Sequence, residues 1–298
     1  MTYRITPRVD LAFKKIFGVE ENKDLLISLI NSIVSKDDQV EDVVLLNPYN
    51  PKNFRYDKLS VLDIKAMGHS GKRFNIEIQI SDEADYDKRA LYYWAKLYTE
   101  QMQEGSDYSQ LNKAIGIHIL NFLSIPDTQN YHNIFDLRER ASGLYYFKDI
   151  ELHTIELNKF YGDRAIKEKK GKFLSKAEEL NIMLPHIRTA LDRWVTFLSR
   201  HDLLDRNKLP KELSDVKLEK ALGVLEVMNF SAEEREAYES HLKWLGIEAS
   251  TIRKAETKTL NKVAKNMILK GQDLQFISEV TEIPEEELKQ LVAELNKE

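Results

Sequence analysis

Residues 58–80 read KLSVLDIKAMGHSGKRFNIEIQI, and the fold of the chain follows from their pattern. Apolar and polar residues alternate on both sides of a central GHSG, a pattern that predicts two strands joined by a tight turn. If the turn is centred near Ser70, the strands pair antiparallel, with Asp63 opposite Glu77 and Lys65 on the same face as both acids. A slip of one residue would put the two acids on different faces, so this prediction depends on the register of the hairpin.

Asp63 and Glu77 form a candidate metal site. Two carboxylates directly across an antiparallel pair repel each other and destabilise the hairpin, whereas a divalent cation between them removes that repulsion. Mg²⁺ prefers one or two carboxylates together with water and phosphate oxygens. Gln79 lies on the same face as Glu77 and favours the metal interpretation. The alternative is a solvent-facing strand edge that carries ordinary acidic residues.

Further motifs stand in a fixed order around this hairpin. They are Pro7-x-x-Asp10-x-x-Phe13-Lys14-x-Ile16-Phe17, Leu62-Asp63-Ile64-Lys65, Phe74-Asn75-Ile76-Glu77-Ile78-Gln79, Arg89-Ala-Leu-Tyr-Tyr93-Trp94 on a predicted helix, and an apolar strand at 114–120. With these motifs the chain resembles the Rpn family of recombination-promoting, transposase-like nucleases, which belongs to the PD-(D/E)XK nuclease superfamily. The resemblance extends over about the first 160 residues.

The resemblance implies an α/β fold, with a restriction-endonuclease-like mixed sheet flanked by helices and followed by an all-α C-terminal region. It also implies a Mg²⁺-dependent DNA endonuclease, with Mn²⁺ as a substitute ion, linked to recombination or mobile-element activity. Asp63 and Glu77 would hold the ion. Asp10 is a candidate additional ligand, and its alternative role is that of an acid in the first turn of a helix. Gln79 stands where the superfamily has lysine and cannot act as a cation or base, so its expected catalytic role is to orient water.

Four further residues are candidates for substrate binding. Arg89 and Tyr93 share a helix face one turn apart, so we expect Arg89 to contact phosphate and Tyr93 to support it. The alternative is an aromatic core beside a surface arginine. Lys14 on the N-terminal helix and Lys65 on the hairpin could add positive charge, although solvated lysines are the commoner outcome.

Composition excludes several classes of protein. The 298 residues include no cysteine, which excludes disulfides, zinc-thiolate sites and thiol nucleophiles. The sequence lacks an apolar segment of signal-peptide or membrane-spanning length, so we expect a cytoplasmic protein without membrane contact. The net charge of −5 disfavours a passive nucleic-acid binder, although a nuclease can bind DNA through a local basic strip. His118, within the apolar strand, is expected to be a hydrogen-bonded core histidine.

The sequence also predicts how the chain is organised. Residues 1–160 form the nuclease-like domain, 161–250 a helical region and 251–298 a small C-terminal helical unit. Strand 40–46 is predicted to be buried on both faces, and a helix within 81–105 to bury a stripe that includes Leu91.

Further helices are predicted at 216–228, 232–244, 250–270 and 274–280, and a final helix begins at Pro284. The final helix opens with three glutamates, and a helix that reads DNA presents this end to the groove. A packing or protein-interaction role is therefore favoured for the C-terminal unit.

Two other functions remain open at this level. The first is a catalytically inactive nuclease fold that acts as a DNA-binding or protein-interaction module. The second is a helical scaffold that binds a partner through the residues after 180. DNA is the expected partner of the nuclease, and a homodimer is a candidate assembly for cutting both strands.

Overall fold

The computed structural model describes residues 5–47, 64–81, 85–160 and 174–295. The chain divides into two compact units, Met1–Glu234 and Arg235–Glu298. Each unit is described by itself. The predicted domain boundaries at 160 and 250 stay predictions.

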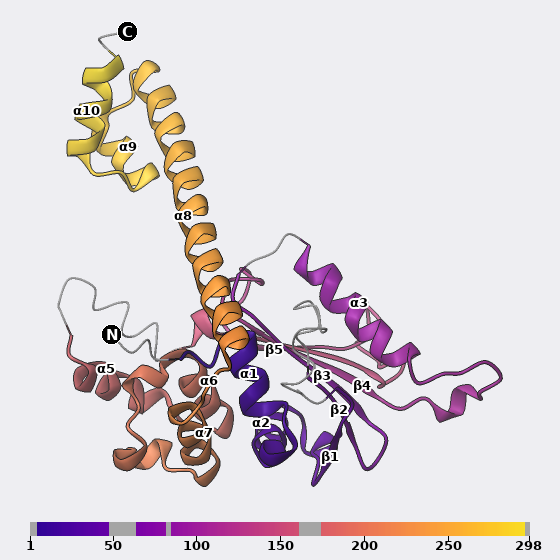
Figure 1. Cartoon of the computed structure of the whole chain (residues 1–298). Helices are drawn as coiled ribbons and strands as arrows, with labels where there is room; N and C mark the ends of the chain where they lie inside the picture. Colours follow the sequence, from indigo (N-terminus) through magenta and orange to yellow (C-terminus); the bar gives the residue numbers. More distant parts are fainter. Residues whose placement is uncertain (1–4, 48–63, 82–84, 161–173, 296–298) are drawn as a thin grey trace. The chain divides into compact units, whose positions relative to one another are not determined.

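The first unit contains a mixed sheet, for which the described residues supply six strands in the order β1-β2-β3-β4-β6-β5 (Figure 1). The strands are β1 (Val43–Leu45), β2 (Ile64–Gly68), β3 (Arg73–Gln79), β4 (Ala114–Leu120), β5 (His132–Phe135) and β6 (Ile150–Glu156). Strands β3, β4 and β6 are parallel, and the remaining neighbours pair antiparallel. This mixed sheet with flanking helices confirms the predicted restriction-endonuclease-like fold class.

The hairpin of β2 and β3 has the register that the sequence predicts. Ile64 pairs with Ile76 and Lys65 pairs with Asn75. The turn needs Gly71, whose φ of +83° lies in the left-handed region that glycine enters without strain. Asp63 lies outside the described residues, so its position opposite Glu77 stays a prediction.

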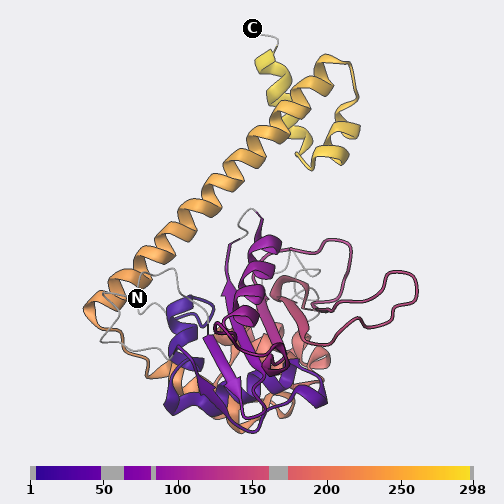
Figure 2. The same cartoon turned by 90° about the vertical axis from the view of Figure 1, so that its right-hand side faces the viewer.

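Helices cover both faces of the sheet (Figure 2). One face packs on α1 (Asp10–Phe17), α2 (Lys23–Ile33), α6 (Ala190–Arg200) and α7 (Val216–Glu226). The other face is covered by α3 (Tyr86–Thr99). Alternation along the strands explains the division, because Phe74, Ile76 and Ile78 belong to the main core while Asn75 and Glu77 point to the other side.

Residues far apart in the sequence share the main core. Phe17 of α1 meets Trp194 of α6 edge to face, with ring centroids 5.4 Å apart. Helix α6 begins with a capping box, in which the Thr189 side chain accepts from the Asp192 amide and the Asp192 side chain accepts from the Thr189 amide. The shorter α5 (Lys176–Met183) precedes it and adds Met183 to the same core.

Three details differ from the sequence predictions. Val44 is 50% exposed, so the prediction that the first strand is buried on both faces was wrong, because β1 is an edge strand. Leu91 is also 50% exposed, since α3 buries the face that carries Tyr86, Ala90 and Trp94. Strand β5 was not predicted.

The second unit contains most of α8 (Ala232–Leu269), together with α9 (Leu274–Thr281) and α10 (Glu285–Leu295). Helix α8 replaces the two helices that were predicted at 232–244 and 250–270. A small core of Ala264, Ile277, Ile283 and Leu288 joins the three helices. No helix in the described part of the chain is long and apolar enough to span a membrane.

Candidate functional site

A cluster of three buried polar side chains lies under α3. Glu77 on β3 is 3% exposed, and its Oε2 accepts a hydrogen bond from the Tyr86 hydroxyl at 3.1 Å. The His118 Nδ1 lies 3.2 Å from the same oxygen and 2.9 Å from the Tyr86 hydroxyl. Glu77 Oε2, the Tyr86 hydroxyl and His118 Nδ1 therefore form a triangle in which each atom contacts the other two.

The secondary structure brings these residues together. The parallel pairing of β3 with β4 sets Glu77 directly beside His118, so their side chains share a face. Tyr86 begins α3, which crosses that face. Its ring packs edge to face against His118 and against Phe122, with centroid distances of 5.8 Å and 5.6 Å. These ring contacts fix the hydroxyl over the carboxylate.

The Glu77 carboxylate has no lysine or arginine partner among the described side chains. The second carboxylate oxygen, Oε1, accepts no hydrogen bond from the described segments. A buried carboxylate is costly unless it is paired with a cation or coordinates a metal. The arrangement therefore suits a cation that binds at Oε1.

The metal-ligand set is only partly described. The described residues contain no group of three or more histidine, aspartate or glutamate side chains suited to one metal ion. Mg²⁺ binds through one or two carboxylates and keeps several waters, so the chemistry of Glu77 fits this ion without a larger protein cluster. Asp63, the other predicted ligand, lies outside the described segments.

The start of α1 lies at the edge of the sheet where β3 and β4 end. The Asn121 amide donates to the Gln79 carbonyl at 2.8 Å, and the Arg8 Nη1 donates to Asn121 Oδ1 at 2.7 Å. Asp10 follows in the first turn of α1 and is buried. The structure thus brings the segment that carries Asp10 to the end of the strand that carries Gln79.

A buried ion pair holds the loop that follows β4. Glu156 accepts hydrogen bonds from the amides of Ser124 and Ile125, at 2.6 Å and 3.1 Å, and pairs with Lys159 at 2.6 Å. Lys159 also donates to the Ile125 carbonyl. This network fixes the loop beside Asn121, and we assign it no further role.

The predicted substrate-binding residues differ in their surroundings. The Arg89 guanidinium is half-buried and lies 4.9 Å from the Tyr86 ring centroid, which brings it to the Glu77 cluster. Tyr93 is half-buried one turn farther along α3, beside the Tyr92 ring at 5.8 Å. Both roles stay predictions.

The two lysines lie apart from this cluster. Lys65 Nζ pairs with Glu100 Oε2 at 3.1 Å on the surface. Lys14 is half-buried on α1. Their proposed contacts with substrate stay predictions.

Sequence reasoning missed two partners of Glu77. His118 is a hydrogen-bonded core histidine, as predicted, but its hydrogen bond with Tyr86 and its contact with Glu77 were not foreseen. Tyr86 was not singled out at all. The signal that could have found it is its position one helical turn before Arg89, on the helix face that meets the sheet.

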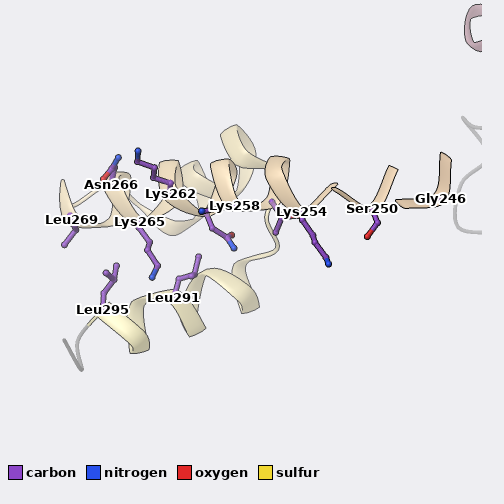
Figure 3. A pocket seen from close by; sticks show the side chains of 12 residues that line it. Gly246, Ser250, Lys254, Lys258, Lys262, Lys265, Asn266, Leu269, Leu291 and Leu295 are labelled. Carbon is purple, nitrogen blue, oxygen red and sulfur yellow. The ribbon is translucent and has the colours of Figure 1, made fainter. Parts of the chain in front are cut away.

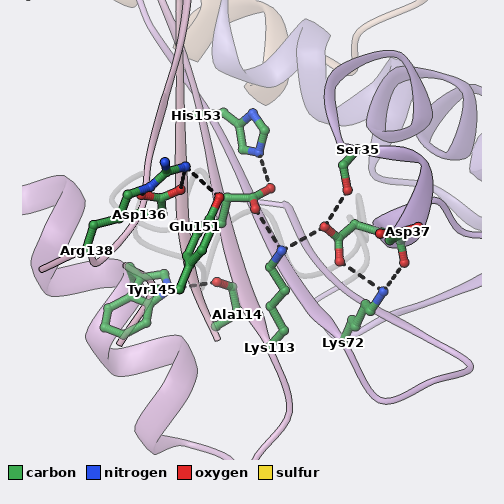
Figure 4. Close-up of polar contacts among 12 residues, drawn as sticks. Ser35, Asp37, Lys72, Lys113, Ala114, Asp136, Arg138, Tyr145, Glu151 and His153 are labelled. Carbon is green, nitrogen blue, oxygen red and sulfur yellow. Dashed lines mark hydrogen bonds and ion pairs between the residues drawn. The ribbon is translucent and has the colours of Figure 1, made fainter. Parts of the chain in front are cut away.

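A second polar cluster lies on the opposite face of the sheet (Figure 4). Lys113 pairs with Asp38 and with Glu151, both at 2.7 Å. From Glu151 a chain of hydrogen bonds continues to His153 at 2.8 Å and from there to His132 at 2.9 Å. Because Glu151 and His153 pair with Ile115 and Ile117 of β4, they lie on the side of the main core.

Ionisation in this second cluster follows from its pairing. Burial alone would raise the pKa of Asp38, but hydrogen bonds from Lys113, Lys72 and Ser35 bring that pKa below its ordinary value. The pKa of Glu151 is lowered in the same way, because hydrogen bonds from His153 and Lys113 outweigh burial. Burial and the neighbouring His153 charge lower the pKa of His132 to about 4. The cluster is therefore a network of paired charges that ends at neutral His132.

A family model described as PD-(D/E)XK nuclease family transposase matches residues 7–255. Searches of curated proteins and of solved structures found no match. The matched region contains the sheet, α3 and every residue of the Glu77 cluster.

Proposed function

Because the chain belongs to the PD-(D/E)XK nuclease family transposases, we propose that it is a Mg²⁺-dependent DNA endonuclease that hydrolyses phosphodiester bonds. The observation that carries this proposal is Glu77, a buried carboxylate on a central strand whose Oε2 accepts a hydrogen bond from the Tyr86 hydroxyl and lies 3.2 Å from the His118 ring. Linkage to recombination or to movement of mobile elements is part of the same proposal.

The residues proposed to hold the ion are Asp63, which directly precedes β2, and Glu77, with Asp10 as an additional ligand. The hairpin register supports this set, because it pairs Ile64 with Ile76 and so leads towards an Asp63–Glu77 pair. When bound, the ion would activate water for hydrolysis and neutralise charge that develops on the phosphate.

The protein's own side chains would orient the reacting groups. Tyr86 and His118 fix the Glu77 carboxylate, so that only Oε1 faces away from them. Gln79 would orient the attacking water, in the place of the lysine that other members of the superfamily carry. Arg89 would contact the phosphate backbone with support from Tyr93, and Lys14 and Lys65 would add positive charge along the DNA.

A plasmid-nicking assay tests the proposal. Wild-type protein is incubated with supercoiled plasmid and Mg²⁺ or Mn²⁺, beside Asp63→Ala and a matched Asp127→Ala control at an exposed position. We expect wild type and Asp127→Ala to cut the plasmid and Asp63→Ala to leave it intact. EDTA should abolish cutting by every variant.

The competing function gives a different result. If neither wild type nor the variants cut, and calorimetry detects no binding of Mn²⁺, the nuclease fold acts as a catalytically inactive module. The replacement of lysine by Gln79 is the feature of this sequence that favours such an outcome.

A further inference from the structure

A groove of about 940 Å³ runs along α8 in the second unit (Figure 3). Lysines, small polar residues and leucines line it. They are Gly246, Ser250, Lys254, Thr257, Lys258, Asn261, Lys262, Lys265, Asn266, Leu269, Leu291 and Leu295. All but the last two belong to α8, and α10 supplies Leu291 and Leu295. The groove therefore has one long basic wall and a short apolar end.

Charge is unevenly distributed around this groove. Residues 243–270 contain seven lysines and arginines and two glutamates, a balance of +5. Residues 273–298 contain two lysines and eight acidic residues, a balance of −6. Four lysines and no acidic residue line the groove. The groove is thus a basic strip within a unit that is acidic elsewhere.

Three lysines of this strip have no acidic partner among the side chains that the structure describes. Lys254, Lys258 and Lys262 are exposed, and none of them forms an ion pair with a side chain that the structure describes. Lysines four residues apart on a helix repel each other and weaken the helix. Such an arrangement is unfavourable for folding and suits the binding of a polyanion.

The spacing of the lysines fits an extended phosphate backbone. Lys254, Lys258, Lys262 and Lys265 follow one another at intervals of four, four and three residues. With a rise of about 1.5 Å per residue, they extend over roughly 16 Å of one helix face. Thr257 and Asn261 lie between them and are types of side chain that donate hydrogen bonds to phosphate oxygens.

The open end of the groove leaves room for a backbone to approach. Gly246 and Ser250 continue the same face at intervals of four residues before Lys254. A Cβ atom added at Gly246 would meet no atom within 4 Å. The acids of α10, at 285–287, are in its first turn, whereas Leu291 and Leu295 line the groove from later turns.

We propose that this groove binds the sugar–phosphate backbone of DNA. The choice of DNA among polyanions rests on the proposed nuclease function, while the groove itself does not depend on that function. The sequence disfavoured the final helix as a DNA reader, and the structure assigns the contact to the basic face of α8 instead.

The salt dependence of binding tests this inference in the full-length protein. Fluorescence anisotropy with a labelled 20-base-pair duplex, in EDTA to prevent cleavage, compares wild type with the triple variant Lys254→Gln, Lys258→Gln, Lys262→Gln. Each phosphate contact contributes about 0.9 to the slope of log K against log salt, so the triple variant should show a slope shallower by roughly 2.7. Its affinity near 0.1 M salt should fall roughly 10- to 100-fold.

A matched variant controls for charge alone. Lys243→Gln, Lys270→Gln, Lys289→Gln removes three exposed lysines of the same unit that do not line the groove, and should keep most of the affinity and slope. Single Lys→Gln changes within the groove should each lower the slope by about 0.9. Circular dichroism checks that every variant is folded.

Three results would overturn the inference. The first is a groove variant whose affinity for the duplex and salt slope equal those of wild type. The second is a control variant that loses as much affinity and slope as the groove variant. The third is a wild-type protein that does not bind the duplex but self-associates through the same lysines. Binding is measured without cleavage, so a protein that fails to cut plasmid but shows lysine-dependent binding contradicts only the nuclease proposal. A protein that cuts plasmid but binds DNA independently of these lysines contradicts only the groove.

Discussion

Two polar clusters lie on opposite faces of the same sheet, and they differ in how their buried charges are paired. Around Lys113 each charge meets an opposite charge, since the Lys113 ammonium lies 2.7 Å from both Asp38 and Glu151. Around Glu77 the only described partners are a tyrosine hydroxyl and a histidine ring. The first cluster pairs its charges through lysine and carboxylates, whereas Glu77 in the second has no lysine or arginine partner among the described residues.

We infer from this difference that the Lys113 cluster stabilises the fold, and we propose that the Glu77 cluster takes part in chemistry. A compensated network joins the segment after α2 to the starts of β4 and β6, so its removal should weaken the fold. An uncompensated carboxylate adds little to stability, because its own desolvation opposes folding. Its retention in a buried position is explained if it binds a cation during function.

The largest expected effect is on activity, from Glu77→Gln. This change keeps the shape of the side chain and removes its charge, so the proposed ion loses a ligand whose contribution to catalysis is several kcal/mol. Cleavage of plasmid should fall by a factor of about 10³ or more. The free energy of unfolding should change by less than about 1 kcal/mol or increase, because a buried uncompensated charge is removed.

Chemical denaturation separates this result from a folding defect. A Glu77→Gln protein that unfolds at much lower urea concentration than wild type would show that Glu77 acts as part of the scaffold. Glu104→Gln, at an exposed position of the same unit, is the matched control and should leave both cleavage and stability unchanged.

The next effect is on stability, from Glu151→Gln in the compensated cluster. The amide can still accept a hydrogen bond, but Lys113 loses one of its two carboxylates and His153 loses its charged acceptor. Breaking a buried ion pair costs about 3–5 kcal/mol, and the retained Lys113–Asp38 pair places the expected loss near the lower end, at about 3 kcal/mol. Urea denaturation measures it.

The activity of Glu151→Gln tests whether the Lys113 cluster takes part in catalysis. Folded Glu151→Gln protein should cleave plasmid at a rate close to that of wild type, since its cluster faces away from Glu77. If Glu151→Gln instead loses cleavage while keeping its stability, the Lys113 cluster contributes to catalysis and the assignment of roles to the two clusters is wrong.

Local patterns in the sequence were sufficient for one part of this picture. Alternating apolar residues around GHSG predicted the register of β2 and β3, because one face of the hairpin had to be buried. The continuous apolar run at 114–120 predicted the buried strand β4 for the same reason. Glu77 and Gln79 could therefore be placed on the correct strand and face.

The remainder depended on contacts between distant segments. Tyr86 and His118 are 32 residues apart, and no periodicity indicates that a parallel strand and a helix bring both to Glu77. Exposure of Val44 depends on the order of strands, which the pattern of a single strand does not contain. The predicted break between residues 244 and 250 is absent, since the glycine in this interval, Gly246, costs a helix only about 1 kcal/mol and a long helix tolerates it.

The compensated cluster should also give stability a dependence on pH. Burial and the charge of His153 lower the pKa of His132 from 6.5 to about 4, so the unfolded chain binds a proton at this site more readily than the folded chain does. Stability should therefore be complete above pH 6.5 and fall as the pH is lowered towards 4. Between pH 6.5 and 5 the loss should be roughly 2 kcal/mol.

His132→Gln tests this assignment, because the variant has no proton to gain at this position. Its free energy of unfolding should change less than that of wild type over the same pH interval. The paired carboxylates Asp38 and Glu151 also have lowered pKa values, but they lose their contribution at lower pH, below this interval. An equally steep decline in the variant would assign the pH dependence to other groups.

The smallest effect is expected from Tyr86→Phe, which removes only the hydroxyl that holds Glu77 Oε2. The ring can still pack on His118 and Phe122, so stability should change little. Groups that orient a metal ligand contribute about 10- to 100-fold to metal affinity or activity, and His118 still holds the same oxygen, so we expect roughly a tenfold effect. It should appear as a lower kcat and a higher Mg²⁺ concentration for half-maximal cleavage, with KM for DNA unchanged.

The control is Tyr92→Phe, at an exposed position on α3, which should change neither kcat nor the Mg²⁺ concentration for half-maximal cleavage. If Tyr86→Phe lowers stability but leaves the Mg²⁺ dependence of cleavage unchanged, the hydroxyl belongs to the scaffold, and the contrast between the two clusters reduces to Glu77 alone.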